Sequence, residues 1–210
     1  MDNLNQQNTH GGLRDLDRVV DAHQVEENLA LFERFFPAAW KCTKEKAFVI
    51  LCCDVMVWQH MYILATKVGF AVQRWPVIWR KVNQSVMNNC AGYNTTKDYE
   101  IVMLCRKPGT TLATKLNTSI IEASNAQVTK ETNHPFAKPY ELTAKLVEAA
   151  TLEGQLILEP FAGGGSMVLQ MLKQKRHVVA VEKEEHHYNI LLENVKRLHY
   201  LKLNPRFIFK

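Results

Sequence analysis

A glycine-rich turn is the first feature whose residue types and spacing could bind a ligand. The stretch Leu156–Ser166 reads L-I-L-E-P-F-A-G-G-G-S, an apolar run that enters three consecutive glycines. Glycines allow a sharp turn and let a ligand approach the backbone without a Cβ in the way. The helix expected next begins with free N–H groups at its positive dipole end, which suits a carboxylate or a phosphate. Ser166 is placed to cap that helix.

An acidic residue follows at the end of the next expected strand. Glu182 comes directly after the apolar run 178–181. A carboxylate in that position can accept hydrogen bonds from both hydroxyls of a ribose. The turn and the acid together predict a site for an adenosine-containing cofactor. The alternative is an ordinary α/β turn whose glycines serve only packing.

Helices and strands are expected to alternate around this turn. Strands are predicted at 47–53, 70–82, 99–106, 156–158, 178–181 and 206–210, and helices at 19–36, 55–67, 140–150, 167–175 and 184–198. We expect Pro37 to end the first helix and Pro76 to make 70–82 an edge or bulged strand. The alternation predicts an α/β fold with a mostly parallel sheet flanked by helices, in a single domain over residues 1–210.

Two motifs together resemble a known enzyme family. E-P-F-A-G-G-G-S is similar to the cofactor loop of S-adenosylmethionine-dependent DNA amino-methyltransferases, and N-H-P-F-A-K-P-Y-E-L at 133–142 is similar to the H-P-x-x-K-P segment that precedes it. R-W-P-V-I-W-R-K at 74–81 and Y-E-I-V-M-L-C-R-K at 99–107 resemble two further strands of the family. The late position of the cofactor loop resembles the permuted class, including phage-borne members. The resemblance covers most of the chain and implies a Rossmann-like methyltransferase fold.

The resemblance also implies which residues hold the cofactor. S-adenosylmethionine would lie along the turn, with Phe161 packed against its methionine end and Glu182 on its ribose. Asp54 would form part of the wall of the site or, equally, cap the helix that follows it. The implied cofactor-binding residues are Asp54, His134, Pro135, Lys138, Glu159, Pro160, Phe161, Ala162, Gly163, Gly165, Ser166 and Glu182.

The catalytic motif of the family is not found in this sequence. It combines Asp, Asn or Ser with two adjacent prolines and an aromatic residue, and it holds a base taken out of the DNA stack. None of the seven prolines here is adjacent to another. The permuted order would place the motif before the 47–53 strand, so we expect the N-terminal catalytic strand to be missing or supplied by a partner chain. A weaker alternative is N-P-R-F, which offers Asn204, Pro205 and Phe207 as catalytic candidates.

The function implied by the resemblance is methyl transfer from S-adenosylmethionine to an exocyclic amine of double-stranded DNA, with adenine favoured over cytosine. Because the motif is absent, a non-catalytic remnant or partner subunit that binds S-adenosylmethionine or DNA is the alternative. The loss of a strand from the middle of a sheet would expose apolar edges, so self-association is also expected.

Two polar segments are the expected DNA contacts. Residues 83–98 and 110–133 are rich in Asn and Thr, whose side chains can reach base edges. Trp75 and Trp79 are four residues apart on one expected strand and should share a face, with core packing expected for at least one of them. The basic side chains expected near phosphates are Arg74, Arg80, Lys81, Lys97, Arg106 and Lys107.

Composition narrows the class of protein. Apolar residues make up 47% of the chain, which is enough for a sizeable core, and a formal charge of +5 permits a polyanionic partner. The five cysteines form no C-x-x-C pair and no zinc-ligand spacing, so reduced core thiols in the cytoplasm, with no metal, are expected. The start of the chain, Met1–Gly12, is polar, which predicts no signal peptide, and no apolar run is long enough to span a membrane.

Overall fold

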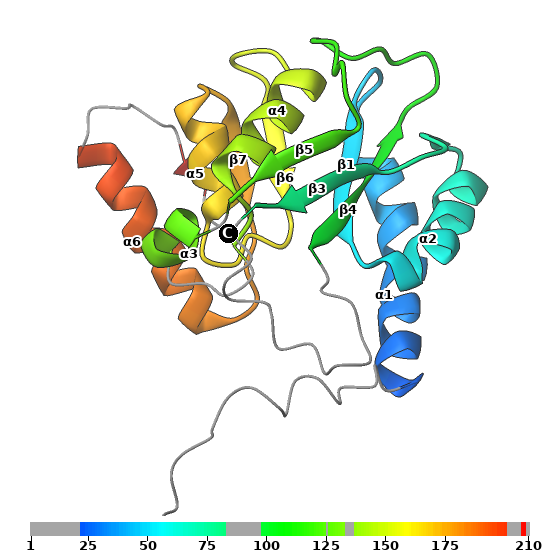
Figure 1. The fold of residues 1–210 in the computed structure, drawn as a ribbon, viewed down its shortest axis with the longest axis horizontal. Coiled ribbons are helices and arrows are strands. Elements are labelled where there is room, and N and C mark those ends of the chain that lie inside the picture. The colour runs from blue at the N-terminus through cyan, green and yellow to red at the C-terminus, as the bar shows by residue number, and fades with distance from the viewer. Residues whose placement is uncertain (1–21, 83–97, 125, 133–136, 201–206, 209–210) are drawn as a thin grey trace, which may run out of the picture.

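A computed structural model describes residues 22–82, 98–124, 126–132, 137–200 and 207–208. In chain order the elements are α1 (Ala22–Cys42), β1 (Phe48–Cys53), α2 (Val55–Val68), β2 (Ala71–Val72), β3 (Val77–Lys81), β4 (Tyr99–Arg106), β5 (Ile120–Ala123), α3 (Ala126–Thr132), α4 (Tyr140–Ala150), β6 (Leu156–Glu159), α5 (Ser166–Lys173), β7 (His177–Ala180), α6 (Glu185–Tyr200) and β8 (Phe207–Ile208). Figure 1 shows them as neighbouring sheets with helices packed against them, which confirms the predicted α/β class.

The strands form two sheets. Sheet A has the order β1-β4-β3-β5, with β2 also paired to β4, and sheet B has the order β6-β7-β8. Sheet B is parallel and so is the β3–β5 pair, but β4 runs antiparallel to β1, β2 and β3. The prediction of a mostly parallel sheet is therefore wrong for sheet A. Arg80 near the end of β3 pairs with Tyr99 at the start of β4, so the chain reverses at one edge instead of crossing to the other.

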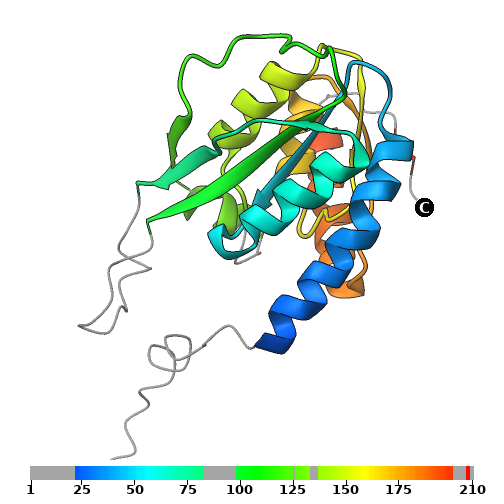
Figure 2. The same cartoon turned by 90° about the vertical axis from the view of Figure 1, so that its right-hand side faces the viewer.

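Sheet A is covered on both faces. Helices α1 and α2 pack against one face through a core that includes Phe36, Met61 and Met103 (Figure 2). Helix α4 packs against the other face, where Leu142 and Leu146 join a core with Trp79 and Val102. Burial on both faces explains why the interior of β4, Ile101–Cys105, is an unbroken apolar run.

Sheet B packs against α5 and α6. Its core contains Leu172 of α5, Val178 of β7 and Leu191 of α6. Val147 of α4 belongs to the same core, whereas Leu146 beside it belongs to the core under sheet A. Helix α4 therefore lies under both sheets and holds them together.

Helix α1 does not end where the sequence predicted. It continues from Ala22 through Pro37 to Cys42, so the predicted stop at Pro37 is wrong. Proline removes one backbone hydrogen bond, a cost that packing on both sides can offset. Phe36 before the proline is fully buried, and Trp40 after it packs edge-to-face on Phe70 at 5.0 Å. Tertiary packing of these aromatic side chains therefore stabilises the helix beyond the proline.

The predicted strand at 70–82 is two strands. The chain leaves the sheet between β2 and β3, and Pro76 lies in that break, where no ladder hydrogen bond is needed from it. Strand β3 is an interior strand between β4 and β5, so of the two predicted alternatives, an edge strand or a bulged strand, the edge position is wrong. Trp79 on β3 is 1% exposed, whereas Trp75 in the break is 60% exposed, so the two do not share a strand face.

The polar segment 110–133 contains regular structure. Strand β5 extends sheet A, and α3 follows it. The alternation of exposed and buried residues in I-I-E-A is the pattern of an edge strand, but it is only four residues long and is surrounded by Thr, Ser and Asn. A four-residue pattern predicts a strand only weakly. In the structure, hydrogen-bonded pairing with β3 stabilises β5.

Candidate functional site

The glycine turn connects β6 to α5 and is fixed by backbone bonds. Ala162 N–H donates to the Val181 carbonyl at 3.0 Å, and Gly165 N–H donates to the Ala162 carbonyl at 2.9 Å. Gly163 and Gly165 have φ of 52° and 88°, a region that glycine adopts at no steric cost. The sequence prediction of a strand, a glycine turn and a helix is confirmed here, and the turn is tied to the residue just beyond β7.

Helix α6 supports this turn from behind. A Cβ added to Gly165 would lie 2.4 Å from Leu191 Cδ1, so a side chain at this position would force Leu191 of α6 to shift. Asn194 Nδ2, one helical turn later, donates to the Gly164 carbonyl at 3.0 Å and is buried. The sequence reasoning missed Asn194, although it stands among the buried positions Leu191, Val195 and Leu198 on one helix face.

Glu182 reaches back to the glycine turn. Its Oε2 accepts a hydrogen bond from Gly163 N–H at 2.6 Å, and its Oε1 accepts one from Glu184 N–H at 2.9 Å. Partial burial would raise the pKa of this carboxyl, but the N–H donors and the nearby His187 imidazole hold the pKa below its ordinary value. Glu182 is therefore an ionised, acceptor-only group, and each oxygen keeps a lone pair beyond the bond described.

Glu159 and Phe161 lie on the other side of the turn. Glu159 Oε1 accepts from Phe161 N–H at 3.1 Å. Burial raises the pKa of Glu159, and the bond from Phe161 offsets this only in part. The ring of Phe161 is 56% exposed and lies 5.9 Å from the ring of Phe35 on α1. The turn thus presents an exposed aromatic ring on a residue whose backbone N–H is bonded to the Glu159 carboxyl.

Lys138 joins the turn to sheet A. Its backbone N–H donates to Ser166 Oγ at 3.2 Å, while its ammonium lies 3.0 Å from Glu100 Oε2 on β4. Glu100 Oε1 also pairs with Lys81 at 2.9 Å. Burial opposes the ionisation of Glu100, but the two lysines lower its pKa below the ordinary value. Lys138 was predicted at the site, whereas its partner Glu100 was not.

Ser166 does not cap α5 through its side chain. The N-cap residue is Gly165, which has no side-chain cap bond, and the Ser166 hydroxyl accepts from Lys138 instead. The expected cap is wrong by one position because the left-handed Gly165 directs Ser166 into the first helical turn. The resulting bond fastens the start of α5 to the segment before α4.

The remaining predicted residues are placed as follows. Asp54 is the N-cap of α2 and accepts from Met56 N–H at 2.9 Å, which is the second of its two expected roles. Phe207 lies on β8 and pairs with Val178, so it is separated from β6 by β7. Pro160 and Ala162 are part of the turn. The expected site residues His134 and Pro135 and the weaker candidates Asn204 and Pro205 lie outside the described residues.

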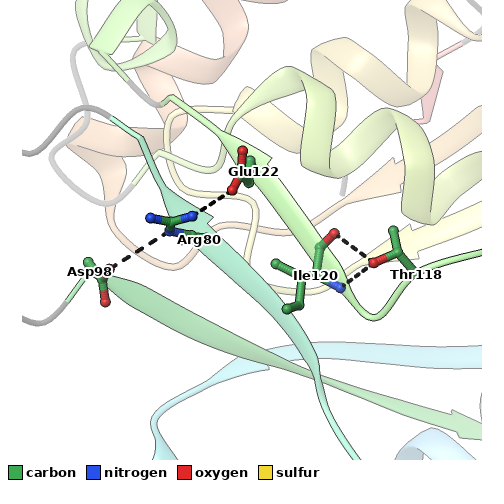
Figure 3. Close-up of polar contacts among 5 residues, drawn as sticks. All are labelled: Arg80, Asp98, Thr118, Ile120 and Glu122. Carbon is green, nitrogen blue, oxygen red and sulfur yellow. Dashed lines mark hydrogen bonds and ion pairs between the residues drawn. The ribbon is translucent and has the colours of Figure 1, made fainter.

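Two lysines that were expected to contact phosphates interact with side chains of the protein instead. Lys81 pairs with Glu100, and Lys107 is 6% exposed, with its ammonium 3.3 Å from the centre of the Trp40 ring. The sequence predicted phosphate contacts for both lysines, but the structure buries them against acidic and aromatic side chains, so this prediction is corrected. Arg80 is exposed and donates to Glu122 Oε1 at 2.7 Å, which joins the ends of β3 and β5 (Figure 3).

The thiol of Cys52 interacts electrostatically with charged groups near the site. Burial raises the pKa of the Cys52 thiol to about 11; Lys138 lowers that pKa, whereas Glu100 and Glu159 raise it. The cysteines that the structure describes are free thiols. Over the described ranges, His, Cys, Asp and Glu side chains form no group of three that could hold a metal ion. No helix in this part of the chain is long and apolar enough to cross a membrane.

A family model described as DNA methylase, of the N6/N4 type, matches residues 10–193. The chain belongs to this family. Members are S-adenosylmethionine-dependent methyltransferases, as the two paired motifs implied. Over 62 residues this methylase chain is 36% identical to the type II methyltransferase M.HindIII of Haemophilus influenzae, and the match covers 30% of the chain and 20% of M.HindIII.

Solved methyltransferases share the fold. A complex of M1.HpyAVI with S-adenosylmethionine matches with a TM-score of 0.70 at 18% identity, covering 81% of this chain and 84% of that one. The cytosine-N4-specific PvuII DNA methyltransferase matches with a TM-score of 0.67 at 13% identity, covering 88% and 79%. The Rossmann-like methyltransferase fold predicted from the motifs is confirmed.

Proposed function

We propose that the methylase chain binds S-adenosylmethionine on the turn Glu159–Ser166 and acts as the cofactor-binding part of a DNA methyltransferase. The bond from Gly163 N–H to Glu182 Oε2 at 2.6 Å carries this proposal. It brings the carboxylate at the end of one parallel strand onto the glycine turn at the end of the neighbouring strand. Ligands of open α/β sheets bind at this end of the strands.

The residues present fit this cofactor. A ribose offers two hydroxyl donors, and the ionised Glu182 offers acceptor lone pairs on an incompletely buried carboxylate. The half-exposed ring of Phe161 offers an apolar surface beside it. The backbone N–H of Lys138 is bonded to Ser166 at the start of α5, where the helix dipole favours an anionic group. His134 and Pro135 are proposed to frame the same site.

The test is binding of S-adenosylmethionine by calorimetry to the chain and to Glu182→Gln. Removing one charge-assisted acceptor should weaken binding by roughly tenfold or more. Glu184→Gln is the matched control, because Glu184 is exposed and the change removes the same charge two residues away. Equal binding by Glu182→Gln and the parent chain, or an equal loss in both variants, would overturn the assignment of Glu182.

We further propose that the methyl acceptor is an exocyclic amine of double-stranded DNA, with adenine as the base and cytosine as the second candidate. The match to the N6/N4 family supports an amine acceptor. Segments 83–98 and 110–133 are proposed to contact DNA. The exposed Arg80, which pairs with Glu122 at 2.7 Å, stands close before the first of them in the chain. When bound, S-adenosylmethionine supplies an electrophilic methyl group.

Transfer of labelled methyl to unmethylated DNA tests this directly. Mass spectrometry of the nucleosides separates N6-methyladenine from N4-methylcytosine. The absence of adjacent prolines favours one alternative, in which the chain binds S-adenosylmethionine or DNA without chemistry, as a remnant or a partner subunit. Binding of S-adenosylmethionine without methyl transfer would support that alternative. Methyl transfer by the chain alone would exclude it and make the N-P-R-F stretch the first place for substitutions.

A further inference from the structure

The exposed ring on the glycine turn has an aromatic neighbour on a distant element. Phe161, just beyond β6, contacts Phe35 of α1, with 5.9 Å between the ring centroids and 39° between the ring planes. Figure 2 shows α1 running alongside the chain that follows β6, in agreement with this contact. Phe35 is partly buried, whereas Phe161 is 56% exposed. The contact therefore supports the Phe161 ring from the side of α1 and leaves more than half of it accessible.

Phe35 is the middle ring of an aromatic series that begins in the core. It packs edge-to-face on Phe36 at 5.4 Å, and Phe36 is fully buried in the core between α1, α2 and sheet A. Phe32, one helical turn earlier, packs edge-to-face on Phe35 at 6.5 Å. Two rings of α1 therefore hold Phe35, and Phe35 in turn contacts Phe161. Side chains whose rotamers are fixed by packing can hold a binding group in one geometry.

Helix α1 is itself a fixed support for these rings. Trp40, further along the helix, packs edge-to-face on Phe70 at 5.0 Å. The ammonium of Lys107 lies 3.3 Å from the centre of the same indole ring. Both partners of Trp40 are buried, with Phe70 2% and Lys107 6% exposed. Because α1 is packed both before and after Phe35, the position of the Phe35 ring relative to sheet A is set by the core.

The backbone of Phe161 is fixed separately from its side chain. Its N–H donates to Glu159 Oε1 at 3.1 Å, and the N–H of Ala162 donates to the Val181 carbonyl at 3.0 Å. These bonds determine where the side chain begins but not the rotamer of an exposed ring. The contact with Phe35 restricts that rotamer. A ring that already has its bound orientation loses less conformational entropy when a ligand packs on it.

We propose that Phe35 is a positioning residue of the cofactor site, which holds the Phe161 ring in the orientation that packs against S-adenosylmethionine. This inference rests on the proposed function, because it requires the cofactor to lie on the turn Glu159–Ser166. Phe35 acts through Phe161 and not by a contact of its own with the cofactor. It lies outside the four stretches that resemble the family, at 74–81, 99–107, 133–142 and 156–166, so the sequence motifs do not indicate it.

The test is calorimetric binding of S-adenosylmethionine to the parent chain and to variants that unfold cooperatively in denaturant. Phe35→Leu removes the ring and should weaken binding by about three- to tenfold, the size expected for the loss of one aromatic pair. Phe35→Met is the second ring-free variant if Phe35→Leu does not fold. Phe35→Tyr keeps the ring and should bind within about twofold of the parent chain. Phe70→Leu is the matched control, because it removes a ring that packs on α1 at Trp40 and not at Phe161. It should lose stability without losing affinity.

A double-mutant cycle tests whether Phe35 acts through Phe161. Phe161→Leu should weaken binding by about tenfold, and the addition of Phe35→Leu should change the affinity no further. Additive losses, unchanged binding by Phe161→Leu, an equal loss in Phe70→Leu, or failure of Phe35→Tyr to retain the affinity would overturn the assignment. Absence of binding by the parent chain overturns the proposed function and this inference with it. Binding that is unaffected by the loss of the Phe35 ring overturns this inference alone.

Discussion

Replacement of Gly165 by alanine tests how the glycine turn is supported. Two separate losses in the free energy of unfolding are expected. Gly165 has φ of 88°, and a Cβ in the left-handed region costs about 1–2 kcal/mol. The new Cβ would also lie 2.4 Å from Leu191 Cδ1, whose residue is 1% exposed and has little room to move. Overpacking of this kind adds about 1–3 kcal/mol, which gives a total loss of roughly 2–5 kcal/mol.

Gly154→Ala separates the two costs. Gly154 has φ of 77° but nothing within 4 Å of an added Cβ, so it should lose only the backbone part, about 1–2 kcal/mol. Denaturant unfolding of both variants at neutral pH measures the difference. In a double-mutant cycle, Gly165→Ala combined with Leu191→Ala should lose less than the sum of the single changes, by about the 1–3 kcal/mol overpacking cost. Equal losses at the two glycines, or strict additivity in the cycle, would refute the packing argument.

Three further changes probe the surroundings of the turn, all by denaturant unfolding. Asn194→Ala should cost roughly 1–3 kcal/mol because the buried Gly164 carbonyl loses its donor, while Glu193→Ala on the exposed face should cost little. Glu100→Gln should cost roughly 2 kcal/mol at pH 7, less than for a fully buried pair because Glu100 keeps 24% exposure. Since the folded pKa of Glu100 is lowered, its contribution exists above the ordinary glutamate pKa, and the difference should shrink as the pH falls below that value. Glu159→Gln should do the opposite: the folded pKa is raised, so the variant gains stability at pH 7, and the gain should vanish in acid, where Glu159 is protonated in both states. A cost for Glu159→Gln at pH 7 would contradict the burial of its carboxyl.

Local sequence determined much of the cofactor half of the molecule. The strand, glycine turn and helix at Leu156–Lys173 and the strand ending before Glu182 have strong signals, because glycines and short apolar runs restrict the backbone locally. The same holds for α2, where the N-cap Asp54 and the left-handed Gly69 mark both ends. These elements depend on neighbours in the sequence, so the sequence alone was enough to predict them.

Other features depend on residues that are distant in the sequence. Helix α1 passes Pro37 because aromatic side chains before and after it find partners on α2 and at Phe70. Strand β5 exists because β3 offers it a ladder, and β4 reverses direction because its start pairs with the end of β3. Nothing in the spacing of the residues involved indicates these pairings.

The site also combines features that the sequence predicts with features that only the tertiary structure shows. Sequence motifs selected Gly163, Glu182 and Lys138, because their residue types suit the cofactor that the motifs imply. Only the tertiary structure decided that Glu182 bonds the turn, and that Lys138 fastens α5 to Glu100 on β4. The strand orders of sheets A and B also became visible only there, since strand pairing is a property of the assembled sheets and not of any single segment.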